Sequence, residues 1–486
     1  MNFETIAANI RLPGQYVEIS AARAVRGLPG KPHKILLLGQ RLATGSVAAG
    51  TLTRVTRAAD AQAFFGRGSM LANMCAQSLK TNGWTETWAL GLADLGAGVA
   101  ATFTHTVTGP ATAAGTLPLY VNGTLVPVGV AAGDSASVIA GKIAAAVTAR
   151  PDLECTAAAA DAVATMTCRH KGLCGNDLDF RYGYYPDEVM PAGVSIVIAA
   201  GTAGAGNPDV LDAIAALGDT WWTEIAMPWT DSTNLNALQA ETQRRWGGMV
   251  KKGVLAYCCR KDTYAGQSTF GSARNNGLET FMPFKRVPTA PWIVAASYAA
   301  LAAFEYGIDP ARPLQNVLLP GVLAPAPADR YTEQEMNLLL YDGMSAWYAN
   351  DQGQVFIARA ITTYQKNSAN ADDTALMDVD TLQKADYVRY AEVNRIALRF
   401  PRHALIDDAN ELPVGKDVVR PKDIDAELAA LGVDLQRAAV IENLDAYNAS
   451  RVVQRDPDDP DAVNVLHSPD FVNALRIYRS KIQFVL

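Results

Sequence analysis

The sequence predicts a multidomain α/β (α+β) protein with a layered α/β core, a β-rich insertion that splits the core, and extended strand arms at both ends. Three observations predict this fold class. Apolar runs alternate with helical patterns at 34–92 and again at 207–259, whereas 96–204 is rich in Ala, Thr and Gly. The last residues form a β-prone run without a helix cap or proline. At 486 residues the chain is long enough for two to four domains.

Six regions follow from this pattern. They are an N-terminal extended arm (1–32), the first part of the α/β core (33–95), a peripheral β-rich inserted domain (96–205), the second part of the core (206–350), a C-terminal domain (351–470) and a C-terminal strand arm (471–486).

The core regions alternate strands and helices. Residues 34–39 (KILLLG) form a continuous apolar run closed by glycine, the pattern of a strand buried on both faces. A helical pattern at 58–82 and a strand at 86–92 follow. After the insertion, helices are predicted at 211–217 and 235–246, and strands at 222–227 and 254–259. One layered domain is therefore interrupted by the insertion.

The insertion contains a predicted hairpin at 117–128, because Asn122-Gly123 supplies the positive φ angles of a tight turn. A helix capped by Asp134 or Ser135 should end at Arg150-Pro151, with short strands around 164–169 and 195–199. Beyond the insertion we expect a buried helix at 291–304, a Thr332-x-x-Glu335 capping box, a strand at 355–361 and an amphipathic helix at 380–400.

Composition limits the classes of function. The formal net charge is -7 without a run of Lys or Arg, so we expect no direct contact with nucleic acid. The apolar run at 291–304 is shorter than the roughly 20 residues that span a bilayer, and the start lacks a secretory pattern, so neither membrane insertion nor export is expected. Six cysteines, with Cys258 and Cys259 adjacent, favour folding in a reducing cytoplasm.

Both ends of the chain have the pattern of strands, and we expect each of them to join a sheet in a neighbouring molecule. The two runs consist of Tyr16, Val17, Glu18 and Ile19 in the first arm and of Ile482, Gln483, Phe484 and Val485 in the second. A strand without a partner in its own chain gains its missing main-chain hydrogen bonds by joining the sheet of a neighbour. Donor and acceptor surfaces that differ give head-to-tail contacts, which build rings or helical filaments.

Several blocks in a fixed order resemble one family over nearly the whole chain. They are RAVRGLP (23–29), FGRGSM (65–70), RHKG (169–172) with GND (175–177), DPARPL (309–314), PGVLAP (320–325), NLLLYDG (337–343), ITTYQ (361–365) and FPR (400–402). The sequence resembles the tail sheath proteins of Mu-like contractile-tailed phages. The resemblance implies a structural subunit of the virion that has neither catalytic residues nor a cofactor nor a bound metal.

The same resemblance implies an assembly. Sheath subunits of this family form hexameric rings that stack helically around an inner tail tube, exchange terminal strands, and contract to drive the tube through the host envelope. The implied partners are further copies of the chain, the tail tube protein, and the baseplate and tail terminator proteins. Synthesis and assembly would take place in the cytoplasm of the host bacterium. By analogy the C-terminal half faces the tube and the insertion faces outward.

The predicted helix at 380–400 carries a possible tube-facing surface. Arg395, Arg399 and Arg402 fall at i, i+4 and i+7 and share one face, while Tyr390, Val393, Ala397 and Phe400 form an apolar stripe. A basic stripe of this kind can grip an acidic tube through contacts weak enough to break. The alternative is a solvated face or ion pairs within the subunit.

Two motifs suggest other functions. Gly201-x-x-Gly204-x-Gly206, with Glu224 about 20 residues later, invites a dinucleotide-dependent enzyme, but the order of the glycines is reversed and a flexible re-entry linker fits better. Cys168, His170 and Cys174 suggest a metal, but the cluster lacks a fourth ligand at zinc-like spacing.

Overall fold

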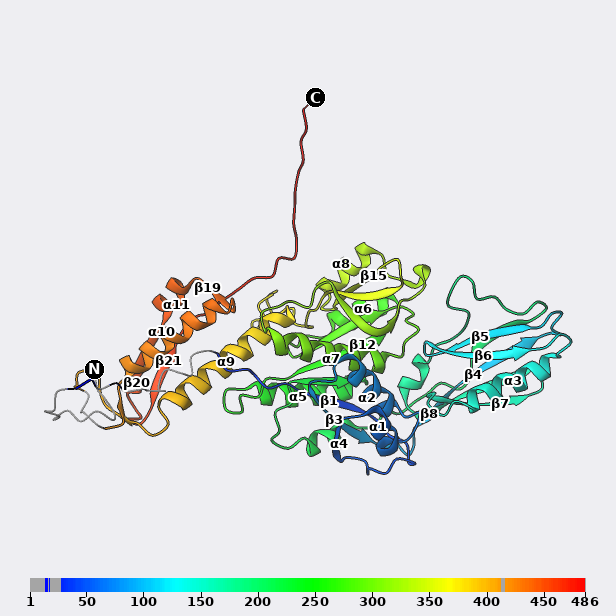
Figure 1. Ribbon diagram of the computed structural model, residues 1–486, viewed down its shortest axis with the longest axis horizontal. Coiled ribbons are helices and arrows are strands. Elements are labelled where there is room, and N and C mark those ends of the chain that lie inside the picture. The colour runs from blue at the N-terminus through cyan, green and yellow to red at the C-terminus, as the bar shows by residue number, and fades with distance from the viewer. Residues whose placement is uncertain (1–13, 16, 18–27, 412–415, 486) are drawn as a thin grey trace. The chain divides into compact units, whose positions relative to one another are not determined.

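The structure is a computed structural model that describes residues 14, 15, 17, 28–411 and 416–485 (Figure 1). Two compact units make up the chain. The large unit comprises Pro32–Asp386 and Ala474–Leu486, and the small unit comprises Met1–Lys31 and Tyr387–Asn473. Tyr16, Glu18 and Ile19 of the predicted first arm lie outside the described residues, and Val17 is exposed without regular secondary structure.

A six-stranded sheet forms the centre of the large unit, in the order β13-β12-β11-β1-β3-β2. Its strands are β1 (Lys34–Gln40), β2 (Leu52–Val55), β3 (Glu86–Leu92), β11 (Glu224–Met227), β12 (Leu255–Lys261) and β13 (Glu279–Phe284). All neighbours are parallel except β2 and β3. Strands β1 and β11 pair directly although the insertion separates them in sequence. The predicted split α/β core is therefore confirmed.

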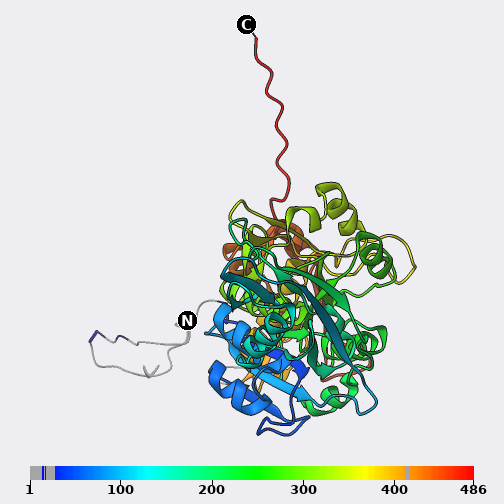
Figure 2. The same cartoon turned by 90° about the vertical axis from the view of Figure 1, so that its right-hand side faces the viewer.

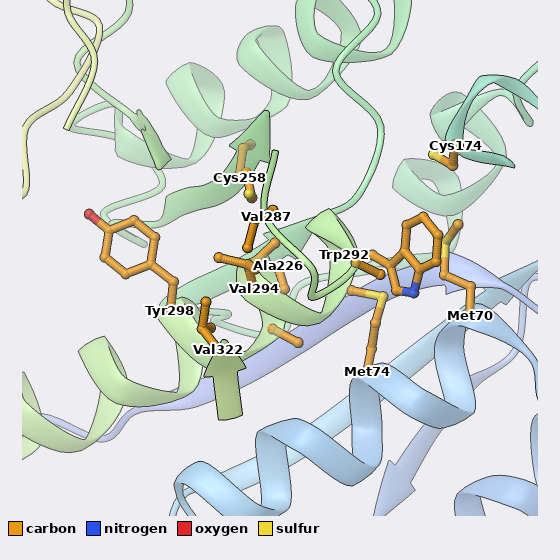
Figure 3. Packing of buried hydrophobic residues seen from close by; sticks show 14 of the residues in the cluster. Met70, Met74, Cys174, Ala226, Cys258, Val287, Trp292, Val294, Tyr298 and Val322 are labelled. Atoms are coloured by element: carbon orange, nitrogen blue, oxygen red, sulfur yellow. The ribbon is translucent and has the colours of Figure 1, made fainter. Parts of the chain in front are cut away.

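Helices cover this sheet and complete its core. They are α1 (Ala58–Phe65), α2 (Met70–Thr81), α4 (Val210–Ala216), α5 (Ser232–Trp246), α6 (Tyr264–Ser272) and α7 (Pro291–Ile308). Met70 and Met74 of α2 lie beside the buried Trp292 of α7 (Figure 3). Helix α7 is buried over most of its length, as predicted, because its residues are apolar on every side. No helix within the described ranges combines the length and apolarity needed to cross a membrane.

The prediction of a single helix at 58–82 is wrong, because the chain forms two helices there, α1 and α2. Gly66 and Gly68 have φ angles of 90° and 80°, outside the right-handed helical region. An added Cβ at Gly68 would lie 2.4 Å from the Pro151 carbonyl oxygen. The glycines therefore end α1 and let the inserted domain approach closely, and Ser69 then caps α2 through the Ala72 amide.

The inserted domain contains two sheets and a helix. Its elements are β4 (Ala100–Thr108), β5 (Gly115–Val121), β6 (Thr124–Val130), α3 (Ala136–Thr148), β7 (Cys155–Ala160), β8 (Val163–Lys171), the short 3-10 helix η1 (Leu173–Asp177), β9 (Phe180–Tyr182) and β10 (Ser195–Ala200). The sheet orders are β10-β4-β8-β7 and β6-β5-β9. Asn122 and Gly123 have φ angles of 47° and 79°, which confirms the predicted hairpin turn. Ser135 caps α3 through the Val138 amide.

A fourth sheet of the large unit has the order β14-β16-β15. Its neighbourhood contains β14 (Val317–Leu323), the 3-10 helix η2 (Pro327–Asp329), α8 (Glu333–Tyr341), β15 (Ala346–Ala349) and β16 (Gln354–Arg359). The predicted capping box of Thr332 and Glu335 begins α8. The sequence predicts a domain boundary after residue 350, but the large unit extends to Asp386. The chain stays in the large unit beyond residue 350 because β16 pairs with β14 and β15.

The small unit is built on helices. Helix α9 (Val379–Arg399) begins in the large unit and continues into the small one. The remaining elements are β17 (Ala404–Leu405), β18 (Val418–Val419), α10 (Pro421–Arg437), β19 (Ile441–Glu442), α11 (Leu444–Ser450), β20 (Val452–Arg455), β21 (Val463–Leu466) and β22 (Asp470–Phe471). Apolar side chains of α9, α10 and α11 form a separate buried cluster.

Candidate assembly surface

The C-terminal arm is the most exposed apolar segment of the large unit. Residues 477–485 are all exposed and have no regular secondary structure. Ile482, Phe484 and Val485 expose 88%, 80% and 97% of their surface. The segment extends away from the large unit without folding back onto it (Figure 1 and Figure 2). Side chains this apolar are normally buried, so the arm has the composition of a strand that pairs with the edge of a sheet.

The arm has two different faces when it is extended. Side chains alternate between the two sides of a strand. Tyr478, Ile482 and Phe484 share one side, whereas Arg479 and Lys481 share the other. The arm is therefore amphipathic, with its cations before its apolar end.

A fixed point holds the base of the arm. One guanidinium nitrogen of Arg476 lies 2.5 Å from Asp380 and 3.0 Å from Asp378, and the Arg476 side chain is only 14% exposed. The Gln315 amide donates to the Leu475 carbonyl oxygen at 3.3 Å. These contacts thus hold residues 475 and 476 on the large unit, whereas the residues that follow are exposed.

The base of the N-terminal arm is also attached. Leu28 packs against the apolar cluster of the small unit. The Tyr387 hydroxyl donates to the Pro29 carbonyl oxygen and the Tyr390 hydroxyl to that of Gly30, each at 3.3 Å. This arm therefore begins at a defined point on α9.

The three arginines of the predicted basic stripe have different environments. Arg395 lies 2.5 Å from Asp434 and 3.6 Å from Glu427, both on α10, and Arg399 lies 3.1 Å from Glu427. These two arginines form ion pairs within the subunit, the alternative reading of the stripe. Arg402 is exposed but lies beyond the end of α9, whereas Val393 of the predicted apolar stripe is exposed on α9 itself.

The structure shows what fills the crevice beside the central sheet. In parallel α/β sheets ligands bind at the carboxyl ends of the strands, where the strand order reverses, which here lies between β1 and β11. The Gln40 amide at the end of β1 donates to Asp94 at 2.8 Å and to the Lys171 carbonyl oxygen at 2.6 Å. The Cys174 thiol of the insertion lies 3.7 Å from the Pro228 carbonyl oxygen beyond β11. Residues of the insertion therefore line the usual ligand position, together with the ends of β11 and β12.

The glycines at 201–206 do not bind a phosphate either. An added Cβ at Gly204 would lie 2.3 Å from the Gly172 carbonyl oxygen, so the linker is packed and not flexible as predicted. The Asp209 carboxylate accepts from the Leu211 amide and fills the N-terminus of α4 with negative charge. Buried Glu224 pairs with His33 at 2.9 Å, where it cannot meet a ribose.

The residues of the proposed metal cluster have separate structural roles. The two ring nitrogens of His170 contact the Met70 amide at 3.0 Å and Asp94 at 2.9 Å. Burial raises the pKa of the Cys168 thiol to about 12, so it stays protonated. The described residues contain no group of three or more His, Cys, Asp or Glu side chains arranged to hold a metal. Sequence reasoning missed Asp94, whose role depends on contacts more than 50 residues away.

These features are those of a structural protein with an exposed C-terminal arm that is anchored at its base. Residues 203–363 match the family model of the phage tail sheath protein central domain, and residues 371–484 match that of the phage tail sheath C-terminal domain. The chain is 38% identical over 486 residues to the Mu-like prophage FluMu tail sheath protein of Haemophilus influenzae, with 100% of both chains covered. The chain belongs to the tail sheath family of Mu-like phages, a family of structural virion proteins and not of enzymes.

A solved structure with a TM-score above 0.5 shares the fold. A sheath tail protein from Listeria innocua has a TM-score of 0.51 and 15% identity, with 94% of this chain and 95% of that chain covered. A sheath tail protein from Desulfitobacterium hafniense has a TM-score of 0.48 and 15% identity, with 94% and 100% covered. The family models and the full-length relative thus agree that the protein is a phage tail sheath protein.

Proposed function

We propose that this sheath subunit assembles as stacked hexameric rings around a tail tube, and that exchanged terminal strands join each copy to its neighbours. The observation that carries this proposal is the anchored C-terminal arm, whose exposed Ile482 and Phe484 follow the ion pairs of Arg476. A sheet edge in a second copy supplies the main-chain hydrogen bonds that the arm lacks. Family membership supports the same arrangement.

Contraction of these rings drives the tube through the host envelope. Such a machine needs two packings of one subunit, with the extended array held until a baseplate signal releases it. Strand exchange suits this change because the C-terminal arm is exposed and has no regular secondary structure. A subunit can then rotate against its neighbour while the paired strands stay bonded. The tail terminator binds the other end of the array.

The tube-facing surface of the subunit would lie on α9. Val393 is exposed there and Arg402 is exposed beyond its C-terminal end, whereas Arg395 is paired with α10. An exposed cation and an exposed apolar side chain each make contacts that are individually weak. Weak contacts hold the tube in register and still break during contraction.

Electron microscopy of the purified protein tests the proposal. The intact chain should form tubes or stacked rings, and a chain that lacks residues 482–486 should remain monomeric or form small oligomers. Val189→Asp with Val197→Asp is the matched control, because it places two charges at exposed apolar positions of the insertion. The control should still form tubes. Tubes of normal appearance from the truncated chain would refute strand exchange.

A further inference from the structure

The four-stranded sheet of the inserted domain has two open edges. Its order is β10-β4-β8-β7, and in the described part of the chain no strand pairs with the outer side of β10 or of β7. Proteins often protect such edges with Lys, Pro or a β-bulge. Both edge strands are instead regular six-residue strands without a charge or a proline, SIVIAA in β10 and CTAAAA in β7. The domain therefore presents two unprotected edges.

Hydrogen bonds beside each strand show which backbone groups face these edges. The Gly201 amide, directly after β10, donates to the Thr102 carbonyl oxygen of β4 at 2.8 Å. The Arg169 amide of β8 donates to the carbonyl oxygen of Glu154, directly before β7, also at 2.8 Å. Because successive residues turn their backbone groups to opposite sides, every second residue faces outward. The outward-facing residues are Ile196, Ile198 and Ala200 in β10 and Cys155, Ala157 and Ala159 in β7.

The two open edges complement each other in direction and length. All neighbouring strands of the sheet are antiparallel, so the edge strands β10 and β7 run in opposite directions. A second sheet in the same orientation therefore brings its β7 antiparallel to β10. Full overlap places Ser195 opposite Ala160 and Ala200 opposite Cys155. In this register outward-facing backbone groups meet each other, whereas a slip by one residue would separate them.

We propose that β10 of one copy pairs with β7 of a second copy in this full-overlap register, so that the sheets of neighbouring inserted domains become continuous. The inference rests on the proposed assembly of identical copies, because contacts between two different edges repeat only in a ring or a helix. It assigns the inserted domain a contact that is separate from the terminal arms.

The side chains on the covered face of the sheet agree with this register. Ile196 and Ile198 pair with buried residues of β4, so both belong to the covered face. The register places these large side chains opposite Ala159 and Ala157 of the second copy. Cross-strand pairs of a large and a small side chain leave room for the isoleucines to reach the helix beyond β7.

Helix α3 offers an uncharged surface at that position. It packs against β7 (Figure 1), and the Thr148 hydroxyl donates to the Ala157 carbonyl oxygen at 3.4 Å. This side of α3 therefore lies at the open edge of β7. Val138, Gly141 and Ala145 precede Thr148 at helical spacing, and all of them are exposed, Val138 by 45%. The isoleucines of a neighbouring copy would cover this surface.

The segment around β10 can be buried without removing a charge from water. No charged residue occurs from Val189 to Pro208, although 19% of the whole chain is charged. Val197, on the other face of the sheet, is 65% exposed and would lie opposite Ala158. Desolvation of a charge is the main cost of a buried contact, and this edge avoids it.

A disulfide tests the register in tubes of the full chain. Val197→Cys with Ala158→Cys should give a ladder of linked subunits on a denaturing gel after oxidation. The native cysteines are all buried, and in one copy the two positions lie three strands apart, at least about 14 Å, beyond the reach of a disulfide. The ladder therefore reports contacts between copies.

Two further variants keep this experiment specific. Ser195→Cys with Thr156→Cys is the matched control, because both positions are exposed on the same face but four residues apart in the register, about 13 Å. The control should remain unlinked. A ladder in the control and none in the test pair would contradict the register. Linked dimers from Val197→Cys alone would show that β10 pairs with β10 and would overturn the proposal.

A proline tests whether the contact uses backbone hydrogen bonds. Ala200→Pro, added to the pair of cysteines at 158 and 197, removes an outward-facing amide at an exposed position. It should slow cross-linking by at least about fivefold, because a hydrogen bond is lost and the ring occupies the place of the partner strand. Ala200→Val keeps the amide and should cross-link at the original rate. Equal rates for the proline and valine variants would refute strand pairing.

The outcomes separate this inference from strand exchange. The terminal strands hold the copies together, so tubes should still form when Ala200→Pro weakens the contact between inserted domains. If truncation of residues 482–486 abolishes tubes and the test pair in full-length tubes stays unlinked, strand exchange stands and the contact between inserted domains is wrong. If the truncated chain still forms tubes and its test pair gives a ladder, strand exchange is wrong and the contact stands.

Discussion

Arg476 fixes the point at which the C-terminal arm leaves the large unit, and Arg476→Ala removes that point. The guanidinium bridges Asp378 and Asp380, and the Asp380 side chain is only 4% exposed. Removal of one partner from a buried ion pair costs about 3–5 kcal/mol. Here Lys384 stays 3.2 Å from Asp380 and Arg359 stays 2.9 Å from Asp378, so each carboxylate keeps one cation. We therefore expect a smaller loss, about 2 kcal/mol.

Urea unfolding followed by tryptophan fluorescence measures this loss. The chain that lacks residues 482–486 is the background for every variant, so that assembly does not add to the free energy of unfolding. Arg476→Lys is the matched control: it keeps the positive charge but not the planar guanidinium group, and should lose roughly half as much. In the full-length chain Arg476→Ala should also raise the assembly threshold, because the arm must be ordered at each addition. A change in unfolding free energy below about 0.5 kcal/mol would refute the anchor.

Three further predictions concern other parts of the chain. Gly68→Ala should lower the free energy of unfolding by about 2 kcal/mol more than Gly50→Ala does. Both glycines have a positive φ, 80° and 75°, but only at Gly68 would an added Cβ lie close to carbonyl oxygens, at 2.4 and 2.7 Å. Equal thermal stabilities of the two variants would contradict this prediction. Burial raises the pKa of Asp177 from 3.8 to about 6, so its ionised form costs free energy above pH 6 and nothing below pH 4. Asp177→Asn should thus stabilise the fold by roughly 1–3 kcal/mol at pH 8 and not at pH 4, and a gain that persists at pH 4 would exclude a titration effect. Arg395→Ala should lower thermal stability because it breaks the ion pairs with α10. Arg402→Ala should leave thermal stability unchanged and reduce co-sedimentation with tail tubes. If Arg402→Ala lowers stability and leaves co-sedimentation unchanged, Arg402 does not belong to the tube-facing surface.

The central sheet was predictable because its strands are buried on both faces. Continuous apolar runs such as 34–39 and 254–259 have few alternatives in a soluble chain, and alternation with helices dictates parallel pairing. Composition also predicts a strand at the C-terminal end, because its apolar residues follow a segment without helical periodicity. The structure leaves Ile482 and Phe484 exposed and without regular secondary structure, so the strand itself stays a prediction. Both predictions depend on local sequence alone.

The features that escaped prediction depend on distant contacts. The break between α1 and α2 follows from the close approach of Gly68 to Pro151, which no local pattern reveals. Nothing in the sequence distinguishes Asp94 and Arg476 from other charged residues. In the structure Asp94 joins the insertion to the core, and Arg476 anchors the C-terminal arm. The domain boundary moved to residue 386 because β16 pairs with strands that precede it.

The arm of each copy should be hydrogen-bonded to another copy in the assembled sheath. Hydrogen exchange, read by mass spectrometry on peptides that cover residues 478–485, reports this directly. In assembled tubes these amides should exchange at least 100-fold more slowly than in a free peptide of the same sequence, as expected for paired strands at about 2.7 kcal/mol or more of protection. Exchange in tubes as fast as in the free peptide would show that the arm stays unpaired and would contradict the account.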